Sequence, residues 1–329
     1  MKQVVLVFRK PFEGQVSIEY LFYSLSSYLK EQNVSIINRQ LSHYSKGLLN
    51  RLRNVFTITH YHKKIIHVTG DVHYTILGAW FSKRILTIHD LGFMLNKGPA
   101  AKFTYWLFWI YLPVKFSHQV TVVSENTKRD LLKYINVENS KVTVISNFID
   151  AIYKPVVKPK CNLSTIQLLQ IGTAFNKNIS RLLDALEGLD CVLTIIGKLT
   201  DNLKKQLKEK QITYRNLTDL SIDDLYLEYQ QADLLCYVST LEGFGMPVLE
   251  AQATGTPVVC SNCSSMPEIA GDGACYVDPY DIASIRNGIE QVANDKQLTA
   301  KLISSGLINV RRFSKDAVAK AYHKIYQDL

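Results

Sequence analysis

The sequence predicts an α/β protein built from two Rossmann-like, doubly wound domains with parallel sheets. Short runs of aliphatic and β-branched residues alternate with helical stretches, and this alternation starts again in the second half of the chain. Apolar strands without a polar face are typical of parallel sheets that helices cover on both sides. The segment 152–162, rich in proline and lysine, separates the two series and is expected to link them.

The expected strands follow one another at intervals that leave room for a helix. Those of the first half are VVLVF (4–8), SIIN (35–38), IIHV (65–68), ILTI (85–88), QVTVV (119–123) and VTVIS (142–146). Those of the second half are TIQLLQI (165–171), CVLTIIG (191–197), ADLLCYV (232–238) and TPVVC (256–260). Helices are expected between them, over 17–29, 125–135, 180–189, 199–210 and 223–231.

These elements give an N-terminal domain over 1–150 and a C-terminal domain over 151–329, with allowance for a C-terminal helix that packs back on the first domain. Ligands of doubly wound sheets bind at the carboxyl ends of the strands. The expected active site is therefore a cleft between the two domains.

Charge is distributed unevenly over the chain. Residues 1–150 carry 19 Lys and Arg against 9 Asp and Glu, which gives +10, whereas the remaining 179 residues carry 19 against 20, which gives −1. The basic half indicates an anionic partner, either a membrane surface or a nucleic acid. Because no basic and aromatic nucleic-acid recognition motif accompanies the charge, lipid phosphates fit it better.

The aromatic run FTYWLFWIYLPVKF (103–116) is too short to cross a bilayer, and no apolar run of about 18 residues occurs. It is either a buried core helix or a helix lying in the membrane interface. The N-terminus has too short an apolar run for a signal peptide. We therefore expect a cytoplasmic protein, peripheral to the inner face of the cell membrane.

The segment LEGFGMPVLE (241–250) combines turn residues with two carboxylates eight positions apart. Gly243 and Gly245 allow a tight turn, and Pro247 suits the first position of a helix. Free backbone amides at such a helix start form an anion site. Glu242, near the strand end, and Glu250, one turn into the helix, could accept hydrogen bonds from sugar hydroxyls.

Two further loops follow strands of the second half. IGTAFNKNI (171–179) places Lys177 at the start of a helix, where a cation is unfavourable unless an anion such as a diphosphate lies between them. IIGKL (195–199) ends a strand with Gly197 and Lys198 and is expected to border the same pocket. A surface lysine remains the alternative for Lys177.

Polar residues also follow two strands of the first half. His89 and Asp90 follow ILTI, and Asp71 and His73 follow IIHV. The histidines lack the spacing of metal sites, and the pair Cys260 and Cys263 has no second pair to complete a zinc site. No metal site is predicted.

Taken together, these segments resemble the family-four retaining glycosyltransferases, which have the GT-B fold of two Rossmann-like domains. The residues that carry the resemblance are Glu242 to Glu250, which match the E-x7-E motif of that family. Other matching segments are SSMPEIAGDGACYVDPYD (264–281), GTAFNKN (172–178), TVVSENTKRDL (121–131), VISNFID (144–150) and IHDLGF (88–93).

The resemblance implies a role for each matching residue. Glu242 would contact the transferred sugar, Glu250 the ribose, and Lys177 the leaving diphosphate, while His89 would lie beside the reacting centre. Further donor contacts are implied at Gly243, Phe244, Gly245, Met246, Gly172, Thr173, Asn178, Gly197 and Lys198. Acceptor-side contacts are implied at Gly14, Ser17, Asp71, His73 and Asp90.

The resemblance also implies the chemistry. A sugar would pass from a UDP-sugar or GDP-sugar to a hydroxyl of a glycan acceptor, with retention through a front-face substitution and without a metal or other cofactor. The acceptor is expected to be linked to polyprenyl diphosphate, in the synthesis of a bacterial surface polysaccharide such as O-antigen or capsule.

The chain departs from the pattern of that family at several places. Thr173 and Asn176 occupy positions where many relatives have arginine, so Lys177 is left as the main cation, with Lys198 or Arg181 as candidate helpers. The first strand-to-helix loop has one glycine, Gly14, where many relatives have several, and Phe148 replaces a common glycine.

Two other functions are weighed against glycosyl transfer. A nucleotide-sugar 2-epimerase shares the fold but needs acid and base groups near the sugar C2, and the 243–247 loop supplies no such pair. A basic nucleic-acid-binding module would explain the charge of the first half but none of the motifs.

Overall fold

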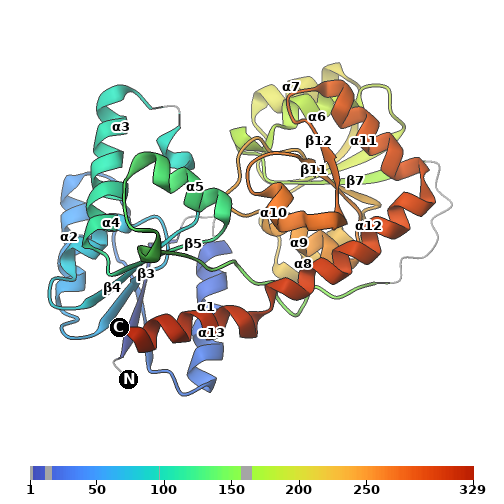
Figure 1. Ribbon diagram of the computed structural model, residues 1–329. Coiled ribbons are helices and arrows are strands. Elements are labelled where there is room, and N and C mark those ends of the chain that lie inside the picture. The colour runs from blue at the N-terminus through green and yellow to red at the C-terminus, as the bar shows by residue number, and fades with distance from the viewer. Residues whose placement is uncertain (1–2, 12–16, 96, 157–164) are drawn as a thin grey trace. The chain divides into compact units, whose positions relative to one another are not determined.

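A computed structural model describes residues 3–11, 17–95, 97–156 and 165–329 (Figure 1). The chain forms two compact units. The first contains residues 1–148 and 315–329, so that the C-terminal helix belongs to it, and the second contains residues 149–314. The expected linker at 152–162 lies partly outside the described residues.

The N-terminal unit has a six-stranded parallel sheet in the order β2-β1-β3-β4-β5-β6. Its strands are β1 (Val4–Phe8), β2 (Ile36–Gln40), β3 (Ile65–Val68), β4 (Lys83–Ile88), β5 (Gln119–Val122) and β6 (Val142–Val144). Alternate residues of β1 enter two different apolar cores, Val5 and Val7 one of them and Val4, Leu6 and Phe8 the other. Both faces of the sheet are therefore covered, as uninterrupted apolar strands predict.

The helices of this unit are α1 (Ser17–Glu31), α2 (Leu48–Thr59), η1 (His73–Gly78), η2 (Gly92–Met94), α3 (Pro99–Tyr105), η3 (Trp106–Tyr111), α4 (Leu112–Phe116), α5 (Glu125–Tyr134), η4 (Asn139–Lys141) and α13 (Lys315–Asp328). The start of α5 illustrates how the sequence sets a boundary. The Ser124 hydroxyl accepts a hydrogen bond from the Thr127 amide and so caps the helix.

The C-terminal unit has a second six-stranded parallel sheet, in the order β12-β11-β10-β7-β8-β9. Its strands are β7 (Ile166–Ile171), β8 (Cys191–Ile196), β9 (Thr213–Leu217), β10 (Leu234–Tyr237), β11 (Val258–Ser261) and β12 (Cys275–Val277). The outer strands β9 and β12 were not expected from the sequence. TYRNL in β9 is mostly exposed and polar, and β12 is only three residues long.

The helices of the second unit are η5 (Phe175–Lys177), α6 (Ile179–Leu186), α7 (Asp201–Glu209), α8 (Ile222–Gln231), α9 (Met246–Thr254), α10 (Met266–Ala270), η6 (Gly271–Gly273), α11 (Ile282–Asn294), α12 (Lys296–Asn309) and η7 (Val310–Phe313). Alternate residues of β10 again enter two cores, Leu234 and Cys236 on one face and Leu235 and Tyr237 on the other.

The aromatic run 103–116 is divided among α3, the π-helical segment η3 and α4. Trp109, Ile110 and Val114 are buried in the core, whereas Phe103 and Phe116 are exposed. Phe108 is exposed as well, so the run contributes its second half to the core and leaves three phenylalanines at the surface. Within the described parts of the chain, no helix is both long enough and apolar enough to cross a membrane.

A buried histidine fastens α13 to the first sheet. His67 of β3 is fully buried, with Nδ1 2.8 Å from the Tyr326 hydroxyl of α13 and Nε2 2.7 Å from the Thr87 hydroxyl of β4. Burial lowers the pKa of His67 to about 3, so that the ring is neutral. α13 lies beside α1 (Figure 1).

We expect Tyr326→Phe to lower the free energy of unfolding of the first unit by about 1–3 kcal/mol, because it leaves a buried His67 nitrogen without its partner. The three tryptophans all lie in residues 80–109, so their fluorescence during urea unfolding reports on this unit. Tyr28→Phe is the matched control. It removes an exposed hydroxyl that bonds Asp316 of α13 and should change stability by less than about 0.5 kcal/mol. Equal effects of the two substitutions would contradict the anchoring role of His67.

Candidate active site

Two loops of the C-terminal unit meet where the strand order reverses. β7 lies between β8, the next strand in the chain, and β10. The loop after β7 contains residues 172–178, and the loop after β10 contains residues 238–245. Ligands of doubly wound sheets bind at this switch point, at the carboxyl ends of the strands.

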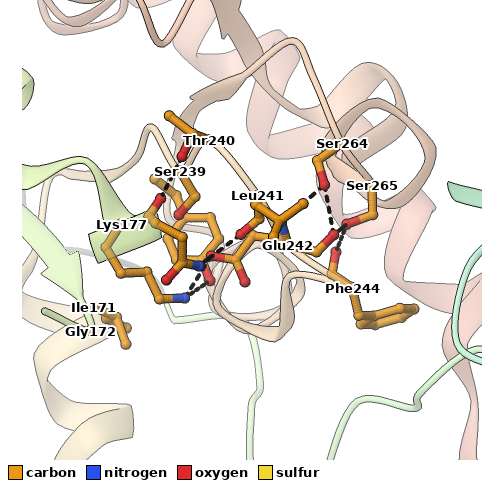
Figure 2. A network of polar contacts seen from close by, with 12 residues as sticks. Ile171, Gly172, Lys177, Ser239, Thr240, Leu241, Glu242, Phe244, Ser264 and Ser265 are labelled. Atoms are coloured by element: carbon orange, nitrogen blue, oxygen red, sulfur yellow. Dashed lines mark hydrogen bonds and ion pairs between the residues drawn. The ribbon is translucent and has the colours of Figure 1, made fainter. Parts of the chain in front are cut away.

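Lys177 and Glu242 form an ion pair between these two loops (Figure 2). The Lys177 Nζ lies 2.7 Å from Glu242 Oε1, and the two side chains are only 17% and 12% exposed. Nζ also donates to the Tyr237 hydroxyl at 2.6 Å, and Asn176 Nδ2 donates to Glu242 Oε1 at 3.2 Å. The sequence singled out the lysine and the glutamate as site residues. It did not single out Tyr237, which from the sequence is only one residue of the apolar strand expected over 232–238.

The backbone before α6 gives Lys177 its position. The lysine lies in the short turn η5 and not in α6, which begins at Ile179 after Asn178 in a left-handed conformation (φ 57°). Gly172 also has a positive φ of 83°, and a Cβ atom there would lie 2.8 Å from Lys177 Cε. Glycine at this position lets the lysine side chain cross the end of β7.

The loop that carries Glu242 is held by two serines. The Ser264 hydroxyl accepts from the Glu242 amide at 2.9 Å and donates to its carbonyl at 2.7 Å. The Ser265 hydroxyl donates to the Phe244 carbonyl at 2.7 Å, and the Phe244 ring is buried. Gly245 has a φ of 111°, and a Cβ there would lie 2.4 Å from a side-chain atom of Met266. The loop is therefore fixed before any ligand binds.

The segment Gly243 to Met246 ends on the first residue of α9, and Pro247 is the second residue of that helix, one position later than expected. Its amide groups stand at the positive end of the helix, which favours an anion. Because the Phe244 side chain is buried, only the backbone of that residue is suited to contact a ligand.

Glu250 lies in α9, and its carboxylate Oε2 accepts a hydrogen bond from the Tyr229 hydroxyl at 2.6 Å. Burial raises the pKa of Glu250 to about 7, and the hydrogen bonds from Tyr229 and Tyr153 oppose that rise. The carboxyl thus changes its charge near neutral pH. The two tyrosines, which the sequence did not single out, orient it.

The remaining predicted residues of this unit mainly tie the loops together. The Thr173 hydroxyl donates to the Lys198 carbonyl at 2.8 Å, which joins the ends of β7 and β8 beside Gly197. The Asn178 amide donates to two backbone carbonyls, and its oxygen accepts from Arg181 at 2.9 Å. The Asn178 side chain therefore braces the loops, and Arg181 is engaged in the same network.

The N-terminal unit has its own switch point, where β1 lies between β2 and β3. Arg9, just after β1, bonds Glu19 (Nε to Oε1 2.6 Å) and also pairs with Asp71, just after β3. Sequence reasoning identified Asp71 but not Arg9, because a lone arginine after a strand carries no signal. Ser17 begins α1, and Gly14 lies outside the described residues.

The histidines that follow β3 and β4 are both neutral because burial lowers the pKa of each, that of His73 to about 4. His73 is buried against the Trp109 carbonyl, 2.7 Å from Nδ1. His89 Nε2 donates to the Thr69 carbonyl at 2.8 Å, which leaves Nδ1 as the acceptor nitrogen. Asp90 is exposed, and its carboxylate accepts from an amide two residues later.

Among the residues that the structure describes, no three His, Cys, Asp or Glu side chains gather in a way that could hold a metal ion. The groups that the structure places at the carboxyl ends of the two sheets are paired charges, backbone amides and the neutral imidazole of His89.

We expect Glu250→Gln to stabilise the protein above pH 7. A raised pKa means that the folded state holds the proton more tightly than the unfolded chain. The stability that this provides is complete below about pH 4.5 and is lost as the pH rises through about 7. The gain of the variant should therefore reach up to about 3 kcal/mol near pH 8 and vanish near pH 4.

Urea unfolding followed by circular dichroism at these two pH values measures the difference. The matched control is Glu290→Gln, which removes a surface pair with Arg286 and should change stability by less than about 0.5 kcal/mol at either pH. If the Glu250→Gln variant were less stable than the wild type near pH 8, Glu250 would be stabilised as a carboxylate.

Two family models match successive parts of the chain. Residues 31–152 match the model described as Glycosyltransferase Family 4, and residues 158–307 match the model described as Glycosyl transferases group 1.

Curated relatives and solved structures agree with this match. The chain is 27% identical to O-antigen chain mannosyltransferase B of Escherichia coli, over 81% of this chain and 75% of that protein. It is 28% identical to O-antigen chain mannosyltransferase RfbU of Salmonella typhimurium, over 70% of this chain and 65% of the relative.

The structure is similar to Anabaena HepE in complex with UDP and glucose (TM-score 0.80, 16% identity, all of both chains). It is also similar to sucrose-phosphate synthase from Thermosynechococcus elongatus (TM-score 0.82, 16% identity, all of this chain and 99% of that one). At this identity the likeness shows the fold, which is GT-B. With both family models matched in succession, the chain belongs to the family-four glycosyltransferases.

Proposed function

We propose that this glycosyltransferase moves a sugar from a UDP-sugar or GDP-sugar to a hydroxyl of a glycan acceptor, with retention of configuration and without a metal. The observation that carries the proposal is the Lys177–Glu242 ion pair at the switch point of the second sheet. It places one cation and one carboxylate beside the amide groups that begin α9.

The ion pair explains how Lys177 and Glu242 can both remain charged in a partly buried site before a ligand binds. Two partly buried charges of opposite sign neutralise each other, which avoids the cost of an unpaired charge. A donor diphosphate offers Lys177 a second anionic partner, and the amides of residues 243–246 offer that diphosphate further donors. Glu242 can then turn to the sugar, while Glu250, oriented by Tyr229, accepts hydrogen bonds from the ribose.

The proposed reaction uses the donor, a hydroxyl of the acceptor and these side chains. The bond between the sugar C1 and the leaving phosphate oxygen breaks, and a bond from the acceptor oxygen to C1 forms on the same face. The acceptor proton passes to the leaving phosphate oxygen, and the products are a glycoside and a nucleoside diphosphate. Lys177 stabilises the charge on the leaving group, and Glu242 stabilises the positive charge on the ring.

The relatives support a more specific choice of sugar and acceptor. Two of them are named O-antigen chain mannosyltransferases, so mannose is the first sugar to test, and a surface polysaccharide the first product. We infer an acceptor linked to polyprenyl diphosphate, presented at the inner face of the cell membrane. His89, with Nδ1 as an acceptor nitrogen, and Asp71 would contact this acceptor.

The two glutamates should fail in different ways. Glu242→Gln keeps the shape of the side chain but removes its charge, so kcat should fall while the affinity for free nucleoside diphosphate stays nearly intact. Glu250→Ala removes hydrogen bonds made equally in the ground state and the transition state. The donor KM should therefore rise by roughly tenfold to a hundredfold, from a loss of about 1.5–3 kcal/mol. The measurement combines kcat and KM in EDTA-containing buffer with calorimetric affinity for the nucleotide product.

Three results would contradict the proposal. If Glu242→Gln lost nucleotide affinity while Glu250→Ala turned over slowly with normal affinity, the two roles would be reversed. If neither changed any constant, the site would lie elsewhere. Release of free nucleotide that is independent of an acceptor, together with inversion at the sugar C2, would identify an epimerase.

A further inference from the structure

Helix α2 (Leu48–Thr59) presents apolar side chains to the outside of the N-terminal unit. Leu48 and Leu49 are 71% and 70% exposed, so neither of them packs against the core of the unit. Its large exposed apolar side chains are those of Leu48, Leu49, Leu52 and Phe56. The inner face of the helix buries Asn54 and Ile58, and Val55 packs against the same core. A surface helix normally turns its large apolar residues inward, whereas α2 also carries four of them on its outer face.

Other contacts hold α2 in place. The Asn54 amide donates to the His43 carbonyl at 2.9 Å and to the Tyr74 hydroxyl at 3.0 Å. The helix also approaches η1 closely, because a Cβ atom on Gly78 would lie 2.2 Å from the Val55 carbonyl oxygen. These contacts fix α2 through its inner face. The four outward apolar residues are therefore not needed to hold the helix on the unit.

The part of the chain that contains α2 is basic, and it has no acidic residues to balance the positive charges. Residues 32–70 contain no Asp or Glu. Their basic residues are Arg39, Lys46, Arg51, Arg53, Lys63 and Lys64. Lys46 and Arg53 are exposed next to the apolar residues of α2. Such a surface attracts an anionic bilayer. It disfavours a symmetric contact with a second copy, which would bring the same cations together.

The turn at Trp80 and Phe81 extends this surface beyond the end of α2. Phe81 is 76% exposed, and both aromatics line a groove with Thr59, the last residue of α2. A second groove is lined by the same two aromatics and by cations, which are Lys63, Lys64, Lys83 and Arg84. Aromatic rings beside lysine and arginine side chains are typical of a membrane interface.

We propose that the outward face of α2, together with the Trp80–Phe81 turn, docks the protein on an anionic membrane surface. The role of this docking rests on the proposed function, because a lipid-linked acceptor lies at the membrane. The surface itself is inferred from the exposed residues and charges of α2. Apolar side chains enter the headgroup boundary, and the basic side chains contact lipid phosphates.

The start of α2 lies near the acceptor edge of the same unit. The Leu41 amide, shortly before α2, bonds the carbonyl of Phe8 at the carboxyl end of β1 at 2.9 Å. Lys10, two residues past that strand end, lies 4.5 Å from the centre of the Tyr44 ring. Since the strands of this sheet are parallel, this is the edge that also carries His89. The Trp80–Phe81 turn, directly before β4, lies at the opposite, amino-terminal edge of the sheet. Docking through the start of α2 would bring lipid headgroups towards the edge that carries His89.

The test is co-sedimentation of the full chain with phosphatidylcholine vesicles that either contain or lack phosphatidylglycerol. The variant carries L48S, L49S, L52S and F56S, which keeps every charge. The matched control carries L227S and I308S, two exposed apolar residues of the second unit. We expect wild type and control to bind the anionic vesicles, and the α2 variant to partition at least about tenfold less. The melting temperature of the variant should stay close to that of the wild type.

Further measurements separate the outcomes. Thermal shift with UDP and GDP in the same samples tests the proposed function independently of vesicle binding. Wild type that fails to bind anionic vesicles at low salt, or an α2 variant that binds them as well as wild type does, would overturn the proposal. A wild-type dimer that the α2 variant converts to a monomer, without vesicle binding, would assign the face to a second copy instead.

Discussion

The ion pair between Lys177 and Glu242 is the interaction on which the rest of the site depends. It joins the loops after β7 and β10, which are neighbours in the sheet but far apart in sequence. Most of the local features serve it, because Gly172 clears the path of the lysine and Tyr237 and Asn176 supply the remaining hydrogen bonds. A diphosphate can replace Glu242 as the partner of Lys177, and the Glu242 carboxylate then keeps the hydrogen bond from Asn176.

The two units use the same topological rule for different chemistry. In each sheet, charged side chains lie at the carboxyl ends of the strands where the order reverses. In the C-terminal unit this edge offers a cation and helix-start amides, which suit a nucleoside diphosphate. In the N-terminal unit Arg9 is already neutralised by Glu19 and Asp71, and His89 is uncharged. That edge is suited to hydroxyl groups rather than to phosphates.

The sequence predicts the central strands correctly because local patterns mark them, and a local motif is also what singles out the two glutamates as candidates. Strands such as β7 and β10 are continuous apolar runs, and the E-x7-E spacing is specific. The edge strands β9 and β12 were missed because β9 is mostly polar and exposed and only Val277 of β12 is buried, so neither shows such a pattern. Tyr229, which orients Glu250, is 21 residues away in sequence, and only the fold brings the two together.

α2 shows a different limit of sequence reasoning. Leu48, Leu52 and Phe56 recur at helical spacing, which normally predicts a buried stripe. The structure buries Asn54 and Ile58 instead, because hydrogen bonds from the Asn54 amide, the core contacts of Ile58 and the close approach of Gly78 define the inner face. Which face of an amphipathic helix is buried therefore depends on tertiary contacts that the helix sequence alone does not contain.

The most direct measurement is calorimetric titration of UDP and GDP into the wild-type protein and Lys177→Ala, in buffer with EDTA. At least one of these nucleotides should bind the wild type without metal, and Lys177→Ala should bind it at least about tenfold more weakly, since a charge-assisted contact to phosphate is lost. Lys204→Ala, an exposed lysine of α7, should leave the affinity unchanged. Equal affinity of wild type and Lys177→Ala, or binding that requires a divalent metal, would contradict the role given to the ion pair.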